Sequence, residues 1–401
     1  MSRKSCCFGC LAIFLFIMLT PVGFLIYWNL RSDVIFISFL NDSENLVFVR
    51  ENGKVVLQNN QGVRLGQKKF RNLRSIIGSQ PDKGLFAFST NKQELHILKI
   101  SDKIVDLVFP IEYSPNKVAF SGSQDVFAVS SQMQQHELDV FGLSQKKHLL
   151  KIKIRSQSPI QDFIFMGNEI WVQCNKKGEN IYVIDTSEYG QGDEVTVSDG
   201  KLSDYQNIIG LKILRDENRF ALYSKNSIYI IDSHNSKNKK LDCLDNEIVS
   251  IIGSTDSELY VLCKYIDNDS FKSEKNCVLV WDMELCELKS QNVIIEDNDL
   301  EIGLSFIRYY DPIFLSHYKM FIFTDGSRMV IYDIFSSKYQ ELPSSIDKFY
   351  HKRPPLCFDK KEDQLAYYAT IMTRDSSDSV RVIDLRFLDN QNEGAFPTQD
   401  F

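Results

Sequence analysis

The stretch IYVIDTS occupies residues 181–187, and the closely similar IYIIDSH occupies residues 228–234. Each is a run of β-branched and aromatic residues that ends in an aspartate, Asp185 in the first and Asp232 in the second. Such residues favour strands, and an aspartate after a strand can accept a hydrogen bond from the backbone N–H two residues on. The pattern predicts a strand followed by a tight turn, and the chain uses it more than once.

The same ending recurs at nearly constant spacing. Five runs end in aspartate, and successive aspartates are 47, 50, 51 and 51 residues apart. A fixed period in this range is typical of propellers and solenoids, in which each unit buries its apolar faces against neighbouring copies. The aspartates are Asp185, Asp232, Asp282, Asp333 and Asp384, and three weaker runs precede them at residues 54–59, 94–100 and 137–143.

Each period contains further short strands separated by turn residues, for example SIIGS at 75–79 and LFAFST at 85–90 before ELHILKI at 94–100. Short strands joined by Gly, Asn, Asp and Ser turns predict antiparallel meanders. The aspartate-ended runs are apolar on both faces, so we expect a third strand that is buried between neighbouring sheets. Residues 146–155 alternate charged and apolar side chains, which predicts an outer strand with one wet face.

One copy carries a family resemblance. VLVWDMELCELK at 278–289 resembles the third-strand ending of a WD40-type β-propeller repeat, and the IYVID and VRVID endings are similar to the YVTN-like variant. The resemblance covers roughly residues 33–386 and implies an all-β propeller of four-stranded antiparallel blades. Only Asp282 follows a tryptophan, and the Gly-His dipeptide of most WD40 blades is absent, which indicates a divergent propeller. The resemblance therefore implies no functional residue.

The number of blades follows from the third strands. Eight such strands predict eight blades, and the last unit has little chain left for a fourth strand before the tail at 387–401. If DVIFISF at 33–39 completes the last blade instead, the ring has seven. The eight units begin near residues 33, 72, 115, 158, 207, 247, 304 and 347.

The first thirty residues form a separate segment. Residues 6–28 contain no charge, and as a helix they would span about 34 Å, enough to cross a bilayer core of about 30 Å. The alternative, a cleaved signal peptide, fits less well because no small-residue cleavage site follows the apolar run. Arg3 and Lys4 place residues 1–5 in the cytoplasm and the propeller, 33–386, across the membrane. We therefore expect a single-pass signal-anchor helix.

Composition excludes some functions. The net charge of −7 and the pI near 5.5 argue against a nucleic-acid binder. The six histidines show no metal-ligand spacing, and we expect them at exposed loops or strand edges. No catalytic, metal or cofactor residue is predicted. The acidic stretches 265–276 and 295–301 lack the pattern of a calcium loop, and we interpret them as solvated loops, the first of which could contact a partner.

Six cysteines belong to the propeller, and their redox state has two interpretations. Cys174, Cys263 and Cys277 stand in or beside apolar strands, where free buried thiols are common. The alternative is a disulfide between Cys263 and Cys277 or between Cys277 and Cys286. We favour mostly free thiols.

Two basic stretches, 64–74 and 350–355, are far apart in sequence. The first and last blades of a closed ring are neighbours, so the two stretches could form one patch that contacts lipid headgroups or an acidic partner. The alternative is a pair of solvated strand edges, because lysine commonly protects edges from pairing. The residues are Lys68, Lys69, Arg71, Arg74, Lys352 and Arg353.

Two classes of function remain. A membrane-tethered scaffold for protein–protein interaction needs no catalytic residues, and the sequence shows none. An extracytoplasmic enzyme or ligand binder would instead need acidic or histidine side chains that converge on the central channel. A structural subunit of a membrane complex is not distinguishable from a scaffold by sequence. We favour the scaffold.

Overall fold

The computed structural model shows an all-β chain. It describes residues 34–40, 45–59, 63–71, 73–90, 93–101, 103–122, 125–156, 158–176, 179–188, 192–197, 208–214, 219–232, 238–243, 246–266, 274–293, 313–315, 317–324, 329–335, 339–342, 356–358, 364–369 and 379–384. These residues form strands and two 3₁₀ turns, η1 (Pro81–Lys83) and η2 (Thr186–Glu188). The expected anchor at 6–28 and the tail at 387–401 lie outside them. Within the described ranges, no helix is long and apolar enough to cross a membrane.

The described strands form eight sheets, which follow one another along the chain. Sheet A contains β1 (Val34–Leu40), β2 (Asn45–Arg50), β3 (Lys54–Asn59) and β4 (Arg64–Lys69), and sheet B contains β5 (Leu73–Gln80), β6 (Leu85–Thr90), β7 (Glu94–Ile100) and β8 (Ile104–Pro110). Sheet C contains β9 (Pro115–Phe120), β10 (Val126–Ser131), β11 (Glu137–Gly142), β12 (Lys147–Ile154) and β16 (Asp193–Val197), and sheet D contains β13 (Ile160–Met166), β14 (Glu169–Lys176) and β15 (Glu179–Asp185).

The second half of the chain continues the series. Sheet E contains β17 (Gly210–Ile213), β18 (Arg219–Tyr223), β19 (Ser227–Asp232) and β20 (Lys239–Asp242), and sheet F contains β21 (Asn246–Ser254), β22 (Glu258–Ile266), β23 (Glu274–Asp282) and β24 (Glu287–Val293). Sheet G contains β25 (Ile313–Leu315), β26 (Met320–Thr324), β27 (Met329–Asp333) and β28 (Tyr339–Leu342), and sheet H contains β29 (Leu356–Phe358), β30 (Gln364–Ala369) and β31 (Ser379–Asp384).

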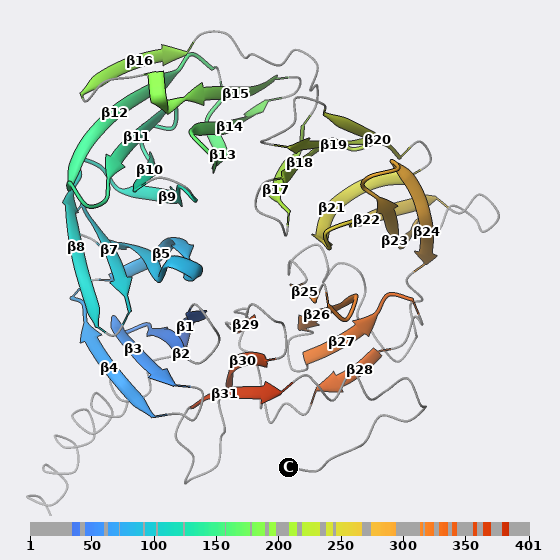
Figure 1. Ribbon diagram of the computed structural model, residues 1–401, viewed down its shortest axis with the longest axis horizontal. Helices are drawn as coiled ribbons and strands as arrows, with labels where there is room; N and C mark the ends of the chain where they lie inside the picture. The colour runs from blue at the N-terminus through green and yellow to red at the C-terminus, as the bar shows by residue number, and fades with distance from the viewer. Residues whose placement is uncertain are drawn as a thin grey trace, which may run out of the picture.

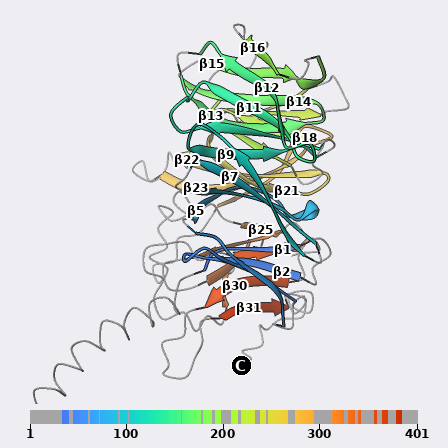
Figure 2. The ribbon, with the colours of Figure 1, turned by 90° about the vertical axis from the view of Figure 1, so that its left-hand side faces the viewer.

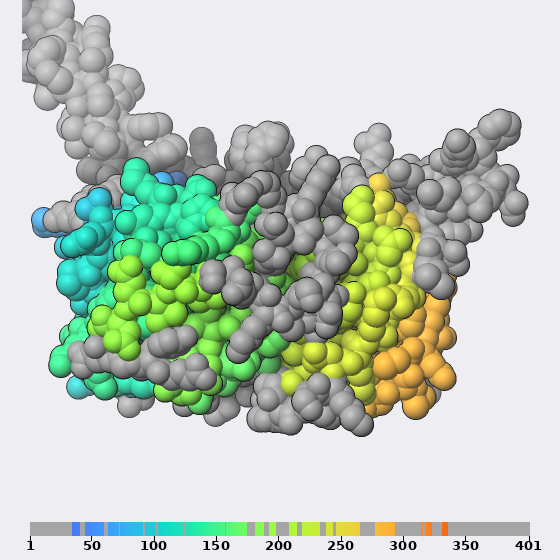
Figure 3. All heavy atoms as spheres, turned by 90° about the horizontal axis from the view of Figure 1, so that it is seen from above, coloured from blue at the N-terminus to red at the C-terminus, as the bar shows by residue number. Residues whose placement is uncertain are grey.

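The sheets stand around a ring, as a β-propeller requires (Figure 1). The first strand of each sheet lies toward the centre, and β4, β8, β12, β20, β24 and β28 lie toward the outside (Figure 1). The ring closes where β1 contacts β29 and β30. Seen from the side, the strands run roughly along the axis of the ring (Figure 2), and the rim of sheets C to F forms its outer wall (Figure 3).

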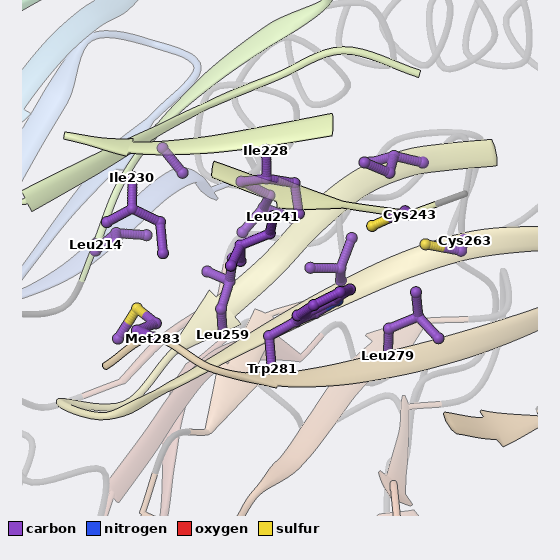
Figure 4. Packing of buried hydrophobic residues seen from close by; sticks show 14 of the residues in the cluster. Leu214, Ile228, Ile230, Leu241, Cys243, Leu259, Cys263, Leu279, Trp281 and Met283 are labelled. Atoms are coloured by element: carbon purple, nitrogen blue, oxygen red, sulfur yellow. The ribbon is translucent and has the colours of Figure 1, made fainter. Parts of the chain in front are cut away.

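The core is not one central cluster but a series of layers between neighbouring sheets. Separate clusters of buried side chains join A to B, B to C, C to D, D to E, E to F and F to G. Successive side chains of a strand point to opposite faces of its sheet. On β23, Leu279 and Trp281 therefore pack toward sheet E (Figure 4), whereas Val278 and Val280 pack toward sheet G. This two-sided burial explains why the third strands are apolar throughout.

The third strands confirm the sequence prediction closely. β15, β19, β23, β27 and β31 end at the five expected aspartates, and the three weaker runs become β3, β7 and β11. Of the stretch 33–39 considered for ring closure, β1 is hydrogen-bonded to β2 within sheet A and also contacts β29 and β30 of sheet H. Residues 265–276 are also shorter as a loop than predicted, because β22 continues to Ile266 and β23 begins at Glu274.

One strand leaves its own unit. After β15 the chain passes through η2, and β16 pairs in parallel with β12 of sheet C, with Leu150 opposite Asp193 and Ile154 opposite Val197. Lys153 on β12 pairs with Glu194 on β16 at 2.6 Å. The predicted alternation of β12 is confirmed by its burial pattern, but its outer edge is covered by a strand from the following unit.

The meander gives the ring two distinct faces. The first strand of each sheet begins on one side of the ring, and the second strand ends on that same side, which we call the proximal face. In sheet A, for example, the start of β1 at Val34 is opposite the end of β2 at Arg50. The third strands end on the other side, which we call the aspartate face. Because strand direction alternates in every sheet, the chain passes from each outer strand to the next sheet on the proximal face.

Gly53 holds the turn between β2 and β3 on the proximal face. Its φ is +79°, a left-handed conformation that favours glycine. Its N–H donates to the carbonyl of Arg50, and its carbonyl accepts from the N–H of Phe70, each at 2.9 Å. A Cβ at this position would lie 2.2 Å from the carbonyl oxygen of Phe70. The turn is thus fixed against the end of β4.

We expect Gly53→Ala to lower the free energy of unfolding by about 2 kcal/mol or more, because alanine is strained at this φ and also meets backbone. Urea unfolding followed by circular dichroism measures the change. Gly122→Ala is the control, because a Cβ there has no atom within 4 Å. Equal unfolding midpoints for the two variants would contradict this account of the turn.

Candidate functional site

The repeated aspartates organise hairpins on the aspartate face. Oδ1 of Asp282 accepts the N–H groups of Glu284 and Leu285 at 2.8 and 2.9 Å. Oδ1 of Asp185 accepts the N–H of Ser187, and Oδ1 of Asp333 accepts the N–H of Phe335, both at 2.9 Å. Asp232 and Asp384 end β19 and β31 at the corresponding positions.

Sheet E holds the hairpin that follows Asp282. Lys239 on β20 donates to the carbonyl of Met283 at 3.0 Å and pairs with the carboxylate of Glu284 at 2.8 Å. Arg219 on β18 approaches the same carboxylate at 3.5 Å and also donates to the carbonyl of Asp256 at 2.6 Å. The hairpin of one sheet is therefore held by two cations of its neighbour.

A second group of charges connects sheet F to sheet G. The carboxylate of Glu258 accepts from Tyr260 at 2.7 Å and pairs with Lys289 and Lys319 at 3.1 and 3.0 Å. Although burial opposes it, these hydrogen bonds hold the pKa of Glu258 below its ordinary value. Lys319 also stands over the ring of Phe335, with its Nζ 5.6 Å from the centroid. Ion pairs thus lie on both sides of the hairpin after Asp282.

Two large apolar side chains stand just after the turn aspartates of sheets F and G. Leu285 is 67% exposed and Phe335 is 50% exposed. They lie at nearly equivalent positions of neighbouring sheets, three and two residues after Asp282 and Asp333. Their backbone N–H groups are bonded to the turn aspartates, so binding a partner there needs little ordering of the backbone.

The predicted basic residues behave differently from one another. Lys68 pairs with Asp106 of sheet B at 3.2 Å. Lys69 is exposed and directly opposite Lys54 in the strand register, and Arg71 and Arg74 are exposed on the chain that follows β4. Lys352 and Arg353 lie outside the described residues.

Like charges gather around Lys54 on the proximal face. Burial, and then the positive charges of Arg64, Arg50 and Lys69, lower the pKa of Lys54. Such crowding favours an anion in the vicinity. We call Arg50, Lys54, Lys69, Arg71 and Arg74 the basic surface.

Sequence reasoning missed a polar cluster between sheets A and B. Nδ1 of His96 lies 3.0 Å from Oδ1 of Asp106, and the same carboxylate pairs with Lys68. The ring of Phe70 meets His96 edge to face at 5.5 Å. The His96 side chain is only 13% exposed, so its predicted place at an exposed edge was wrong. The hydrogen bond to Asp106 raises the pKa of His96.

The central channel carries few ionisable groups. On the described first strands these are Arg74, Lys117, Asp162, Lys212 and Glu247. Lys117 pairs with Asp162 of the neighbouring first strand, and Glu247 pairs with Lys225 at 3.0 Å. In the part of the chain that the structure describes, no group of three or more His, Cys, Asp or Glu side chains is placed to hold a metal ion.

Comparison with known proteins shows the fold alone. No protein-family description matches the chain, and no curated protein matches its sequence. The computationally designed Ika8 protein is similar in structure, with a TM-score of 0.52 and 13% identity over 88% of this chain and 96% of its own. Kluyveromyces lactis Hsv2 has a TM-score of 0.44 and 12% identity over 88% of this chain and all of its own. The likeness to Ika8 supports a β-propeller fold.

We expect the free energy of unfolding to fall as pH rises through the raised pKa of His96. At pH values below the ordinary pKa of histidine, the ion pair of protonated His96 stabilises the folded state by about 1 kcal/mol. This contribution is lost as pH rises through the higher pKa that His96 has in the folded protein. Urea unfolding from about pH 6 to about pH 9 measures it.

His96→Gln should flatten this part of the pH profile. His136→Gln is the control, because Nδ1 of His136 has no hydrogen-bond partner among the described residues. A profile for His96→Gln that parallels the unsubstituted protein over the whole range would show that His96 does not contribute.

Proposed function

We propose that the protein is a membrane-anchored scaffold that binds another protein through its aspartate face. The observation that carries this proposal is the hairpin after Asp282, which Lys239, Arg219 and Lys289 hold in place while Leu285 remains 67% exposed. Phe335 of sheet G is likewise exposed two residues after a turn aspartate, Asp333, and Lys319 stands over its ring. An exposed apolar side chain on a held backbone, with ion pairs around it, resembles the centre and rim of a protein interface.

The proposed anchor at residues 6–28 fits this orientation. The first described residue, Val34, lies on the proximal face opposite Arg50, so the chain reaches the ring beside the basic surface. If residues 6–28 span the membrane with residues 1–5 in the cytoplasm, the basic surface faces lipid headgroups on the extracytoplasmic side. The aspartate face then points away from the bilayer, where a partner can reach it.

The number of blades and the family remain part of the proposal. The described strands form eight sheets, and we propose that each sheet is one blade of the domain at 33–386. The Trp281-Asp282 ending of β23 supports descent from a WD40-like or YVTN-like repeat.

Crosslinking in cells, followed by detergent purification of the full-length protein and mass spectrometry, tests the scaffold. We expect a stoichiometric partner whose recovery falls at least about tenfold in the double variant Leu285→Asp/Phe335→Asp, since buried apolar anchors contribute about 1 kcal/mol or more each. Met133→Asp is the matched control, because Met133 is 86% exposed and follows β10 on the proximal face. A protein that purifies alone, or a partner unaffected by the double variant, would refute the proposed binding face.

Sedimentation with vesicles tests the basic surface, with the chain lacking residues 1–30 so that the proposed anchor does not dominate. We expect binding to vesicles that contain phosphatidylserine and a loss of at least about tenfold in Lys69→Glu/Arg71→Glu, because each basic residue near an anionic bilayer contributes about 1 kcal/mol. Lys146→Glu/Lys147→Glu makes the same charge change on the aspartate face and should leave binding unchanged. Equal losses in the two variants would indicate net charge rather than a surface.

A further inference from the structure

Three thiols meet at the boundary between sheets E and F. Cys243 directly follows β20 of sheet E, whereas Cys263 and Cys277 are on β22 and β23 of sheet F. They belong to one buried cluster and are 3%, 0% and 0% exposed. Cys243 and Cys263 are neighbours within this cluster (Figure 4). Their spacing in sequence matches no redox or metal motif, so the fold alone brings them together.

Cys263 is the central member of the group. Its side chain is hydrogen-bonded to that of Cys243, and in the strand register it is directly opposite Cys277. Sγ of Cys277 has a separate polar neighbour, Oδ1 of Asn246, at 3.7 Å. Cys243 and Cys263 are therefore the two thiols already in contact across the boundary.

Cys243 is the most exposed of the three thiols, although at 3% it is still buried. It lies at the end of the outer strand, where the chain passes to sheet F on the proximal face. Its N–H donates to the carbonyl of Asn226 at 2.8 Å, and its carbonyl accepts from Asn246 at 3.3 Å. The hydrogen bond from Cys263 lowers the pKa of Cys243 and so favours its thiolate.

We propose that Cys243 and Cys263 form a reversible disulfide between sheets E and F when the protein meets a small-molecule disulfide of the oxidised glutathione class. This inference does not depend on the proposed scaffold function. It differs from the two pairings considered from the sequence, Cys263–Cys277 within sheet F and Cys277–Cys286, whose members lie at opposite ends of β23 and its following turn.

The reaction proceeds by two thiol–disulfide exchanges. The Cys243 thiolate attacks one sulfur of oxidised glutathione, which forms a mixed disulfide and releases one glutathione thiolate. The Cys263 thiolate, formed as its proton passes to solvent, then attacks the Cys243 sulfur and releases the second glutathione. Two protein thiols become one disulfide, and two glutathione thiols carry away the two electrons and the two protons.

The bond would close a loop that contains β21 and the first part of β22. A disulfide of this kind restricts the unfolded chain more than the folded one, and here it would also join two sheets whose shared core is already packed. We therefore expect oxidation to raise Tm by a few degrees and to slow the separation of sheets E and F.

The test uses the reduced full-length protein, treated with oxidised glutathione, blocked with N-ethylmaleimide and digested without reduction for mass spectrometry. We expect a crosslinked peptide that contains Cys243 and Cys263, its disappearance in Cys243→Ala, and its persistence in Cys174→Ala. Cys174 is a suitable control because it is equally buried, in a different cluster, and burial raises its pKa to about 11. Dithiothreitol should reverse both the crosslink and the rise in Tm.

Three results would overturn the proposal. These are a Cys263–Cys277 crosslink in the folded protein, a glutathione adduct on Cys243 that never proceeds to the disulfide, and full alkylation of both thiols after treatment. The mapping on the unsubstituted protein needs no variant to fold, so each result is decisive.

Discussion

Apolar packing between neighbouring sheets is the interaction on which the rest of this structure depends. A single meander of three or four strands has two faces and can protect neither from water alone. In the ring, the alternating side chains of one strand fill two different layers, as Leu279 and Val280 do on β23. These apolar layers fix the position of each sheet. Ion pairs and polar side chains then lie on the hairpins, the outer rim and the two faces of the ring. The hairpin after Asp282 and the basic surface both lie in these outer positions.

Two-sided burial is also what made the fold predictable from sequence. A strand that faces a neighbour on each side must be apolar throughout, and the turn after it needs an acceptor for exposed N–H groups. Both requirements are local, so the endings at Asp185, Asp282 and Asp333 could be recognised without knowledge of the rest of the chain. The wet and dry faces of β12 were predictable for the same reason.

Contacts between distant residues were not predictable in this way. His96 looked like an edge residue because its partner, Asp106, belongs to the next strand and its aromatic neighbour, Phe70, belongs to another sheet. Lys68 looked like one more cation of a basic stretch until register placed it beside Asp106. The meeting of Cys243 with Cys263, and the place of β1 inside sheet A, depend likewise on register and on how sheets stack. The ion pairs of Glu284 involve Arg219 and Lys239, which lie on two strands of sheet E, and no rule of sequence spacing describes such a contact.

The parallel strand β16 shows that the repeat in the sequence and the unit in space are not the same object. The segment that follows β15 is added to the preceding sheet C as a fifth strand, while the described strands of its own sheet D number three. Excising or duplicating the chain at the aspartate period would therefore remove a strand from one sheet or supply a surplus strand to another. Sheets C and D therefore have to be gained or lost together. Repeats can be added or removed more readily where no strand is shared between neighbouring sheets.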